Sequence, residues 1–86
     1  MCYNMPHMYT LYIIKCADGS LYTGIARDLE ARLETHRQGT GSKYVRARLP
    51  FSLVYTEKLK DRSKATKREM AIKKLTRDEK LELIKS

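Results

Sequence analysis

Apolar and polar positions alternate along the first quarter of the chain in a way that predicts a β-hairpin. Residues Tyr9–Cys16 are rich in aromatic and β-branched side chains, and both alternating sets are largely apolar. Such a strand is typically central in its sheet and covered on both faces. The dipeptide Asp18-Gly19 is a strong hairpin turn signal, so residues 21–25 are predicted to form the returning strand.

The chain then changes to helical spacing. Asp28 is a good N-cap, because its side chain can accept from the free amides of a first turn. A helix is expected over Leu29–Arg37, with Gly39 ending it. Residues 40–49 are predicted to form a basic loop that ends at Pro50.

The remaining segment is predicted to contain one strand and two helices. Residues 51–57 have the composition of a third strand, Asp61 or Ser63 is expected to cap a second helix running to about residue 75, and residues 78–84 form a short third helix. The order β-β-α-β-α-α describes a small α+β domain with an antiparallel hairpin. The chain has no glycine-rich phosphate loop and is too short for a βαβ dinucleotide-binding fold.

The first predicted helix has polar residues on its apolar side. Leu29 and Leu33 define the buried stripe, and at about 100° per residue Arg32 and His36 fall on the same side. A charged group beside the core costs free energy unless it is paired or used. Taken singly, Arg32 can lay its stem on the core and extend its charged head to water, and His36 can be a satisfied core histidine.

The second predicted helix repeats this arrangement. Ala65 and Ile72 mark its buried side, and Glu69 lies between them. Taken alone, Glu69 is explained by an ion pair with Lys73 four residues on, in the orientation that stabilises helices.

The charge of the chain favours a polyanionic partner. The formal net charge is +8, and the basic residues concentrate in residues 37–48 and 58–77. Charge runs are usually solvated helix faces, but an excess in two separate segments of a folded domain makes nucleic acid the better explanation. The residues expected to contact nucleic acid are Gly24, Arg27, Lys43, Arg46, Arg48, Arg68, Lys73 and Arg77, with glycine allowing a close backbone approach.

Five side chains would suit phosphodiester cleavage if they converge. Tyr12 and Tyr22 are singly ordinary strand aromatics, but a phenol or imidazole can help to deprotonate an attacking water. Arg32 can clamp a phosphate, and the carboxylate of Glu69 can hold one hard divalent cation. The candidate catalytic set is therefore Tyr12, Tyr22, Arg32, His36 and Glu69.

Several classes of protein are excluded or disfavoured. No apolar run approaches the roughly 18 residues that span a bilayer, and the first residues do not have the pattern of a secretory signal. Cys2 and Cys16 form no zinc-binding spacing, so reduced thiols in a cytoplasmic protein are expected. We expect a flexible arm over residues 1–8, one domain over residues 9–84, and a monomer or weak dimer.

The ordered set of motifs resembles the GIY-YIG nuclease superfamily, and within it the small stand-alone bacterial proteins called UPF0213. The matching pieces are Leu11-Tyr12-Ile13, Tyr22-Thr23-Gly24, Arg32 with His36, Gly41-Ser42-Lys43-Tyr44, Pro50, Leu53-Val54-Tyr55, Lys67-Arg68-Glu69, residues 72–77 and Lys80. The resemblance implies a three-stranded antiparallel sheet flanked by helices. It also implies one site that uses Mg²⁺ or Mn²⁺ to cut DNA.

The resemblance also implies roles for single residues. Tyr12 and Tyr22 take the positions of the motif tyrosines, of which one activates water in such enzymes. Arg32 takes the place of the phosphate-contacting arginine, His36 that of a histidine or tyrosine, and Glu69 that of the metal-binding glutamate. In two places the chain departs from relatives: Ile25 stands where repair-type members often have lysine, and no asparagine follows the glutamate, since Asn4 is the only one in the chain.

A shared tyrosine site makes a demand on the hairpin. A two-residue Asp18-Gly19 loop would pair Lys15 with Tyr22 and place Tyr12 on the opposite face of the sheet. A three-residue loop or a bulge would place both tyrosines on one face, and this arrangement is predicted.

The sequence supports two main hypotheses about function. The first is a metal-dependent endonuclease that acts on DNA, including branched or damaged DNA in repair or recombination. The alternative is a non-catalytic module that binds DNA or structured RNA through the same basic residues, or a protein adaptor whose basic face meets an acidic partner.

Overall fold

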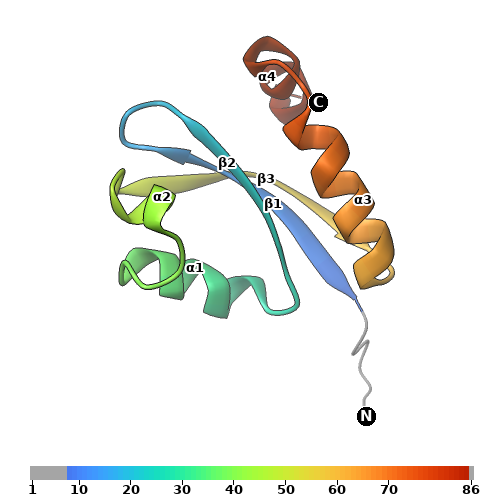
Figure 1. The fold of residues 1–86 in the computed structure, drawn as a ribbon, viewed down its shortest axis with the longest axis horizontal. Coiled ribbons are helices and arrows are strands. Elements are labelled where there is room, and N and C mark those ends of the chain that lie inside the picture. The colour runs from blue at the N-terminus through green and yellow to red at the C-terminus, as the bar shows by residue number, and fades with distance from the viewer. Residues whose placement is uncertain (1–7, 86) are drawn as a thin grey trace.

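The computed structural model describes residues 8–85 as one antiparallel sheet with helices on both faces (Figure 1). The elements in chain order are β1 (Tyr9–Cys16), β2 (Leu21–Ala26), α1 (Leu29–Arg37), α2 (Lys43–Arg46), β3 (Phe51–Leu59), α3 (Arg62–Lys73) and α4 (Arg77–Lys85). The strand order is β2-β1-β3. The predicted α+β class and the three-stranded antiparallel sheet are confirmed.

The capping residues place the helices close to their predicted bounds. Asp28 Oδ1 accepts from the amide of Ala31 at 3.1 Å and begins α1 at the predicted residue. Asp61, rather than Ser63, caps α3, since its Oδ1 accepts from the amide of Lys64 at 2.8 Å. The expected flexible arm over residues 1–8 lies almost entirely outside the described residues.

The loop predicted over residues 40–49 contains a helix that the sequence did not indicate. This helix, α2, is four residues long, and Val45 is its one buried side chain. One buried residue in a four-residue helix gives no helical period to recognise. Among residues 8–85, no helix has both the length and the apolar character needed to cross a bilayer.

The hairpin turn places Tyr12 and Tyr22 on the same face of the sheet, as predicted. The amide of Cys16 donates to the carbonyl of Ser20 at 2.8 Å, so the loop has three residues and includes Gly19 at φ 86°. Such loops combine a turn with a left-handed residue that glycine adopts without strain. In the resulting register Tyr12 pairs with Gly24, and Tyr22 pairs with Ile14.

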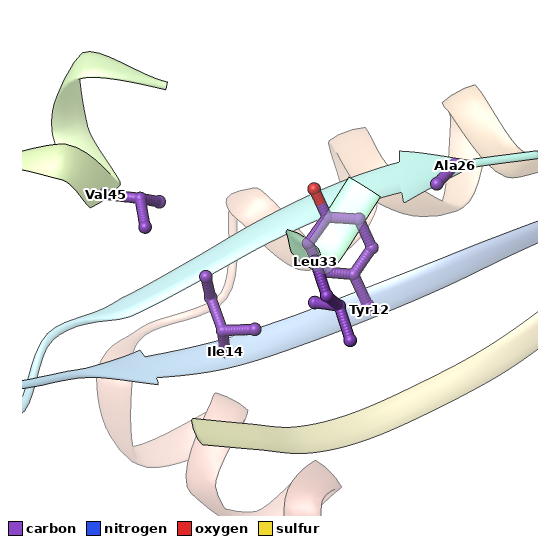
Figure 2. Packing of buried hydrophobic residues seen from close by; sticks show 5 residues of the cluster. All are labelled: Tyr12, Ile14, Ala26, Leu33 and Val45. Atoms are coloured by element: carbon purple, nitrogen blue, oxygen red, sulfur yellow. The ribbon is translucent and has the colours of Figure 1, made fainter. Parts of the chain in front are cut away.

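The central strand β1 is buried on both faces, which confirms its predicted position. Leu11 and Ile13 pack against Ile72 of α3 on one face. On the other face Tyr12 and Ile14 project together toward α1 and α2 (Figure 2), where Leu33 and Val45 are buried against them. The sheet therefore separates two core layers, one covered by α3 and the other by α1 and α2.

A bulge in β3 changes which face its first residues occupy. Ile13 pairs with Tyr55 but Ile14 pairs with Leu53, which leaves Val54 as the extra residue. Phe51 consequently lies on the Tyr12 face and contacts the α1 side of the core. A regular ladder would have turned Phe51 to the other face.

The core layer beneath α3 can be tested at Ile72, which is fully buried. Replacing Ile72 by Ala removes a packed side chain between α3 and β1, so we expect a loss of about 2–5 kcal/mol in the free energy of unfolding. Met70 on the same helix is 55% exposed, and Met70→Ala should change it by less than about 0.5 kcal/mol. Urea unfolding followed by circular dichroism measures both; equal losses would show that α3 does not pack as described.

Candidate active site

Tyr12 of β1 and His36 of α1 form the buried centre of the candidate site. The Tyr12 hydroxyl lies 2.9 Å from Nε2 of His36, and the two side chains are 0% and 2% exposed. The structural explanation of a satisfied core histidine therefore holds for Nε2. It does not hold for Nδ1, which is buried and has no hydrogen-bond partner within residues 8–85.

Two glycines make room for these rings. A Cβ on Gly24 would lie 2.6 Å from the Tyr12 hydroxyl oxygen, and a Cβ on Gly41 would lie 2.7 Å from Nδ1 of His36. Figure 2 shows the Tyr12 ring reaching from β1 toward β2, where Gly24 lies. The Tyr12 ring thus gives Gly24 a structural reason that the sequence did not indicate, and its predicted contact with a nucleic-acid backbone stays a prediction.

A row of aromatic rings extends from the buried pair to the surface. The ring centroid of Tyr22 is 6.5 Å from that of Tyr12 and 5.6 Å from that of His36. Tyr44 stacks on Tyr22 at 5.9 Å, and the guanidinium of Arg48 lies 3.9 Å from the centroid of the Tyr44 ring. Tyr44 was not among the candidate site residues, because its helix α2 was not predicted.

Burial, with a smaller contribution from the exposed Arg32, determines the protonation of the buried pair. Burial, together with Tyr22, raises the pKa of Tyr12 to about 12, against a partly opposing charge and hydrogen bond from Arg32. Burial lowers the pKa of His36 below 6.5, and the charge of Arg32 lowers it further. Tyr12 is therefore a phenol and His36 a neutral imidazole at neutral pH.

These protonation states limit the possible hydrogen bonds. A guanidinium can only donate, so any contact from Arg32 to the Tyr12 oxygen, which lowers the Tyr12 pKa, is one in which the oxygen accepts. In the tautomer of His36 that carries its proton on Nδ1, the Tyr12 hydroxyl donates to Nε2. A phenol whose proton is already shared with a neutral imidazole is prepared to accept a second proton as it releases the first.

Glu69 of α3 comes near the same phenol from another element. Its negative charge acts to raise the pKa of Tyr12, although less than burial and Tyr22 do. The side chain is 20% exposed, and Oε2 lies 3.1 Å from Nζ of Lys73. The ion pair expected for Glu69 alone is thus present, and the carboxylate also lies within electrostatic range of Tyr12.

Three of the five predicted site residues are in contact, and the other two carry charges that act on Tyr12. Tyr12, Tyr22 and His36 contact one another through ring or hydrogen-bond contacts, and Arg32 and Glu69 act on Tyr12 from two helices. Within residues 8–85 no three His, Cys, Asp or Glu side chains gather as a metal-binding cluster. A single carboxylate can hold Mg²⁺ or Mn²⁺ when water and phosphate oxygens supply the other ligands, which is a common arrangement for such ions.

Some of the predicted nucleic-acid contacts have partners inside the protein. Arg68 Nε lies 2.7 Å from Oε1 of Glu57, so this arginine ties α3 to β3. The charge of Lys73 is paired with Glu69. The guanidinium of Arg68 binds a carboxylate of its own domain through two nitrogens, so the predicted phosphate contact of Arg68 would compete with this ion pair and stays a prediction.

Two further arginines hold the hairpin loop. Arg48 Nε lies 3.0 Å from Oδ2 of Asp18, and Arg77 Nη1 donates to the carbonyl of Gly19 at 2.8 Å. Both contacts are on the surface, so they leave part of each guanidinium open to solvent and to a phosphate. The remaining predicted contacts are exposed: Arg27, Lys43 and Arg46.

The packing of Tyr12 on Gly24 predicts a specific cost for Gly24→Ala. The added methyl would overlap the phenol, so we expect a loss of about 1–3 kcal/mol in the free energy of unfolding. In a Tyr12→Phe background the hydroxyl oxygen is gone but the ring carbon 2.8 Å from the added Cβ remains, so the cost should become smaller without disappearing. A double-mutant cycle by urea unfolding measures this coupling; an unchanged cost would assign the clash to the ring carbons and not to the hydroxyl.

The depressed pKa of His36 predicts an acid-dependent loss of stability. The folded state binds the proton more weakly than the unfolded chain, so this contribution is fully present above pH 6.5 and is lost as the pH falls below that value. NMR titration of the His36 Cε1 proton should give a midpoint below 6.5, with a His7→Gln variant to assign the signal. A midpoint at or above 6.5 would contradict the buried neutral imidazole.

Comparison with known proteins confirms the resemblance seen in the sequence. The model of the GIY-YIG catalytic domain matches residues 8–82. A UPF0213 protein of Staphylococcus aureus is 55% identical over 75 residues, which cover 87% of this chain and 92% of the relative. The solution NMR structure of a UPF0213 protein from Bacillus halodurans matches with a TM-score of 0.60 and 38% sequence identity. The solution NMR structure of a protein from E. faecalis matches with a TM-score of 0.65 and 44% sequence identity. Each alignment covers 91% of this chain and 83% of the other chain. The chain belongs to the GIY-YIG catalytic domain family.

Proposed function

We propose that this protein is a divalent-metal-dependent endonuclease that hydrolyses phosphodiester bonds in DNA. The observation that supports it most strongly is the buried Tyr12–His36 hydrogen bond of 2.9 Å with an arginine and a glutamate acting on the same phenol. A purely structural role for Tyr12 and His36 would require only the hydrogen bond between them. A guanidinium and a carboxylate directed at one phenol from two helices match what phosphodiester hydrolysis requires.

Arg32 is the proposed contact to the scissile phosphate. Its side chain is exposed yet close enough to Tyr12 to influence its pKa, so a phosphate bound to the guanidinium would lie beside the phenol. A charge-assisted contact of this kind positions the phosphate and offsets the negative charge that develops as the new bond forms.

The proposed proton path runs from water to Tyr12 and on to His36. As the water oxygen bonds to phosphorus, its proton passes to the Tyr12 oxygen, while the phenol proton passes to Nε2 of the neutral His36. The bond from phosphorus to the leaving sugar oxygen breaks, and that oxygen takes a proton from solvent. Tyr12 is neutral before and after the step. A buried phenolate, which would be unfavourable because the pKa of Tyr12 is raised to about 12, therefore does not have to form.

Glu69 is the proposed residue that would hold Mg²⁺ or Mn²⁺. When bound, such an ion supplies Lewis-acid stabilisation of negative charge on the phosphate. Lys73 would have to release Glu69 for this to happen, since its Nζ lies 3.1 Å from Oε2. Because Lys73 is more than half exposed, this surface ion pair is worth less than about 1 kcal/mol and is readily exchanged.

A second candidate function is a non-catalytic module that binds DNA or structured RNA. The Lys73–Glu69 ion pair favours it, because it neutralises the one carboxylate near the phenol. Under either proposal we place the protein in the cytoplasm, as a monomer or weak dimer, with branched or damaged DNA as the first substrates to examine.

The nuclease proposal is tested by a cleavage panel over single-stranded, duplex and branched DNA with Mg²⁺ or Mn²⁺. Arg32→Ala should lower the rate about 10²–10³-fold through loss of charge stabilisation, and His36→Phe about 10²–10⁴-fold through loss of the proton acceptor. Glu69→Gln should abolish the dependence on metal together with most of the activity.

Glu30→Gln is the matched control for Glu69→Gln, because Glu30 is an exposed acidic residue of α1. It should cut at the rate of the unmodified protein. Absence of cutting on every DNA shape, or full activity of Glu69→Gln, would reject the nuclease proposal. DNA binding that persists without cutting and ignores metal would establish the second candidate.

A further inference from the structure

An arginine-lined cleft opens between the start of α1 and the start of α3. Its volume is about 410 Å³, and its lining includes Arg27, Asp28 and Arg32 on the α1 side, Arg62 on the α3 side, and Ala26 at the end of β2. The volume is large compared with the roughly 30 Å³ that one water molecule takes up in the liquid. The cleft therefore has room for a phosphate together with its neighbouring sugar.

Arg32 belongs both to this cleft and to the candidate active site. Its guanidinium influences the pKa of Tyr12 and of His36, and its side chain also forms part of the cleft lining. A ligand strand that reaches the buried pair through Arg32 would therefore continue along the cleft rather than across closed protein surface.

The other wall of the cleft leads to the same site along α3. Arg62 and Glu69 are seven residues apart on this helix, which is two helical turns, so they lie on one side of it at about 10 Å separation along the axis. The cleft lining thus contains one site residue, Arg32 of α1, and Glu69 lies outside the lining, two helical turns beyond Arg62 on α3.

The charge of the cleft suits a phosphodiester chain. Three arginines line it against one carboxylate, that of Asp28, and Asp28 already accepts from the backbone amide of Ala31 as the cap of α1. Arg62 was not among the residues predicted from the sequence to contact nucleic acid, because it follows the cap of α3 and resembles an ordinary solvated residue. Only the folded chain places it opposite Arg32.

We propose that this cleft binds the nucleic-acid strand next to the cut, with Arg62 holding a phosphate that flanks the one at Arg32. The inference rests on the proposed function for the identity of the phosphate at Arg32, and it adds the path of the strand and a new binding residue. The contacts proposed for Arg32 and Arg62 are to phosphates, which carry no sequence information, so this binding is independent of sequence.

The test is DNA binding by the full chain in the presence of EDTA, which separates binding from cleavage. Fluorescence anisotropy with labelled single-stranded and duplex oligonucleotides, between about 50 and 200 mM salt, gives Kd and its salt slope. Arg62→Gln should raise Kd about three- to tenfold and reduce the salt slope by about one unit. Lys64→Gln is the matched control, since Lys64 is an exposed cation two residues on in α3 and is not part of the cleft lining.

A clearly larger effect of Arg62→Gln than of Lys64→Gln, with thermal unfolding unchanged in both, supports the cleft. Equal effects would overturn it, because binding would then follow net charge alone. A higher Kd for Arg62→Gln with an unchanged salt slope would also overturn it, because no phosphate contact would then have been removed. The two proposals fail separately. If the protein cuts DNA but Arg62→Gln and Lys64→Gln change Kd equally, the nuclease proposal stands and the cleft proposal fails. If Arg62→Gln has the larger effect on Kd but the protein cuts no DNA, the cleft proposal stands and the nuclease proposal fails.

Discussion

The hydrogen bond between Tyr12 and His36 is the interaction on which the rest of the site depends. It joins the central strand to α1 across the core, and it is possible only because Gly24 and Gly41 leave space for the two rings. In a buried setting an unpaired polar atom is costly, so each ring needs the other. Nδ1 of His36 has no partner among residues 8–85, and a buried polar atom of this kind calls for an explanation, of which a catalytic role is one.

Two departures from a regular sheet bring the other aromatic rings to this pair. The three-residue loop, in which Cys16 pairs through Ser20, places Tyr22 on the Tyr12 face. The bulge at Val54 turns Phe51 to the same face, where its ring centroid lies 6.1 Å from that of His36. Each departure adds one residue, and each would reverse the face of its side chains if removed, because side chains alternate with a period of two.

The sequence was sufficient for the parts of the fold that have a period or a cap. The two apolar sets of β1, the caps at Asp28 and Asp61, and the helical phase of His36 all give local signals that the structure keeps. What the sequence could not give was contact between distant segments. Helix α2 has one buried residue, Val45, and so no period.

Long-range pairing also decided which basic residues are free, and the sequence could not supply that pairing. Arg68 and Arg62 are both arginines of α3, six residues apart, and nothing local distinguishes them. Arg68 lies opposite Glu57 of β3 and forms an ion pair, whereas Arg62 lines a cleft with Arg32. The difference comes from the β1–β3 register, which places Glu57 opposite Leu11 on the α3 face.

The location of the site explains how so small a domain can combine a buried base with an open substrate path. Tyr12 lies on the face covered by α1, and Glu69 is on the helix that covers the other face. Because β2 is an edge strand and α3 packs against it, the two faces meet around that edge, where Gly24 provides no side chain to separate them. Edge strands invite pairing with other chains unless charge or cover prevents it. Here the arginines at the end of β2 supply that charge, and the same charge suits the phosphates of a nucleic acid.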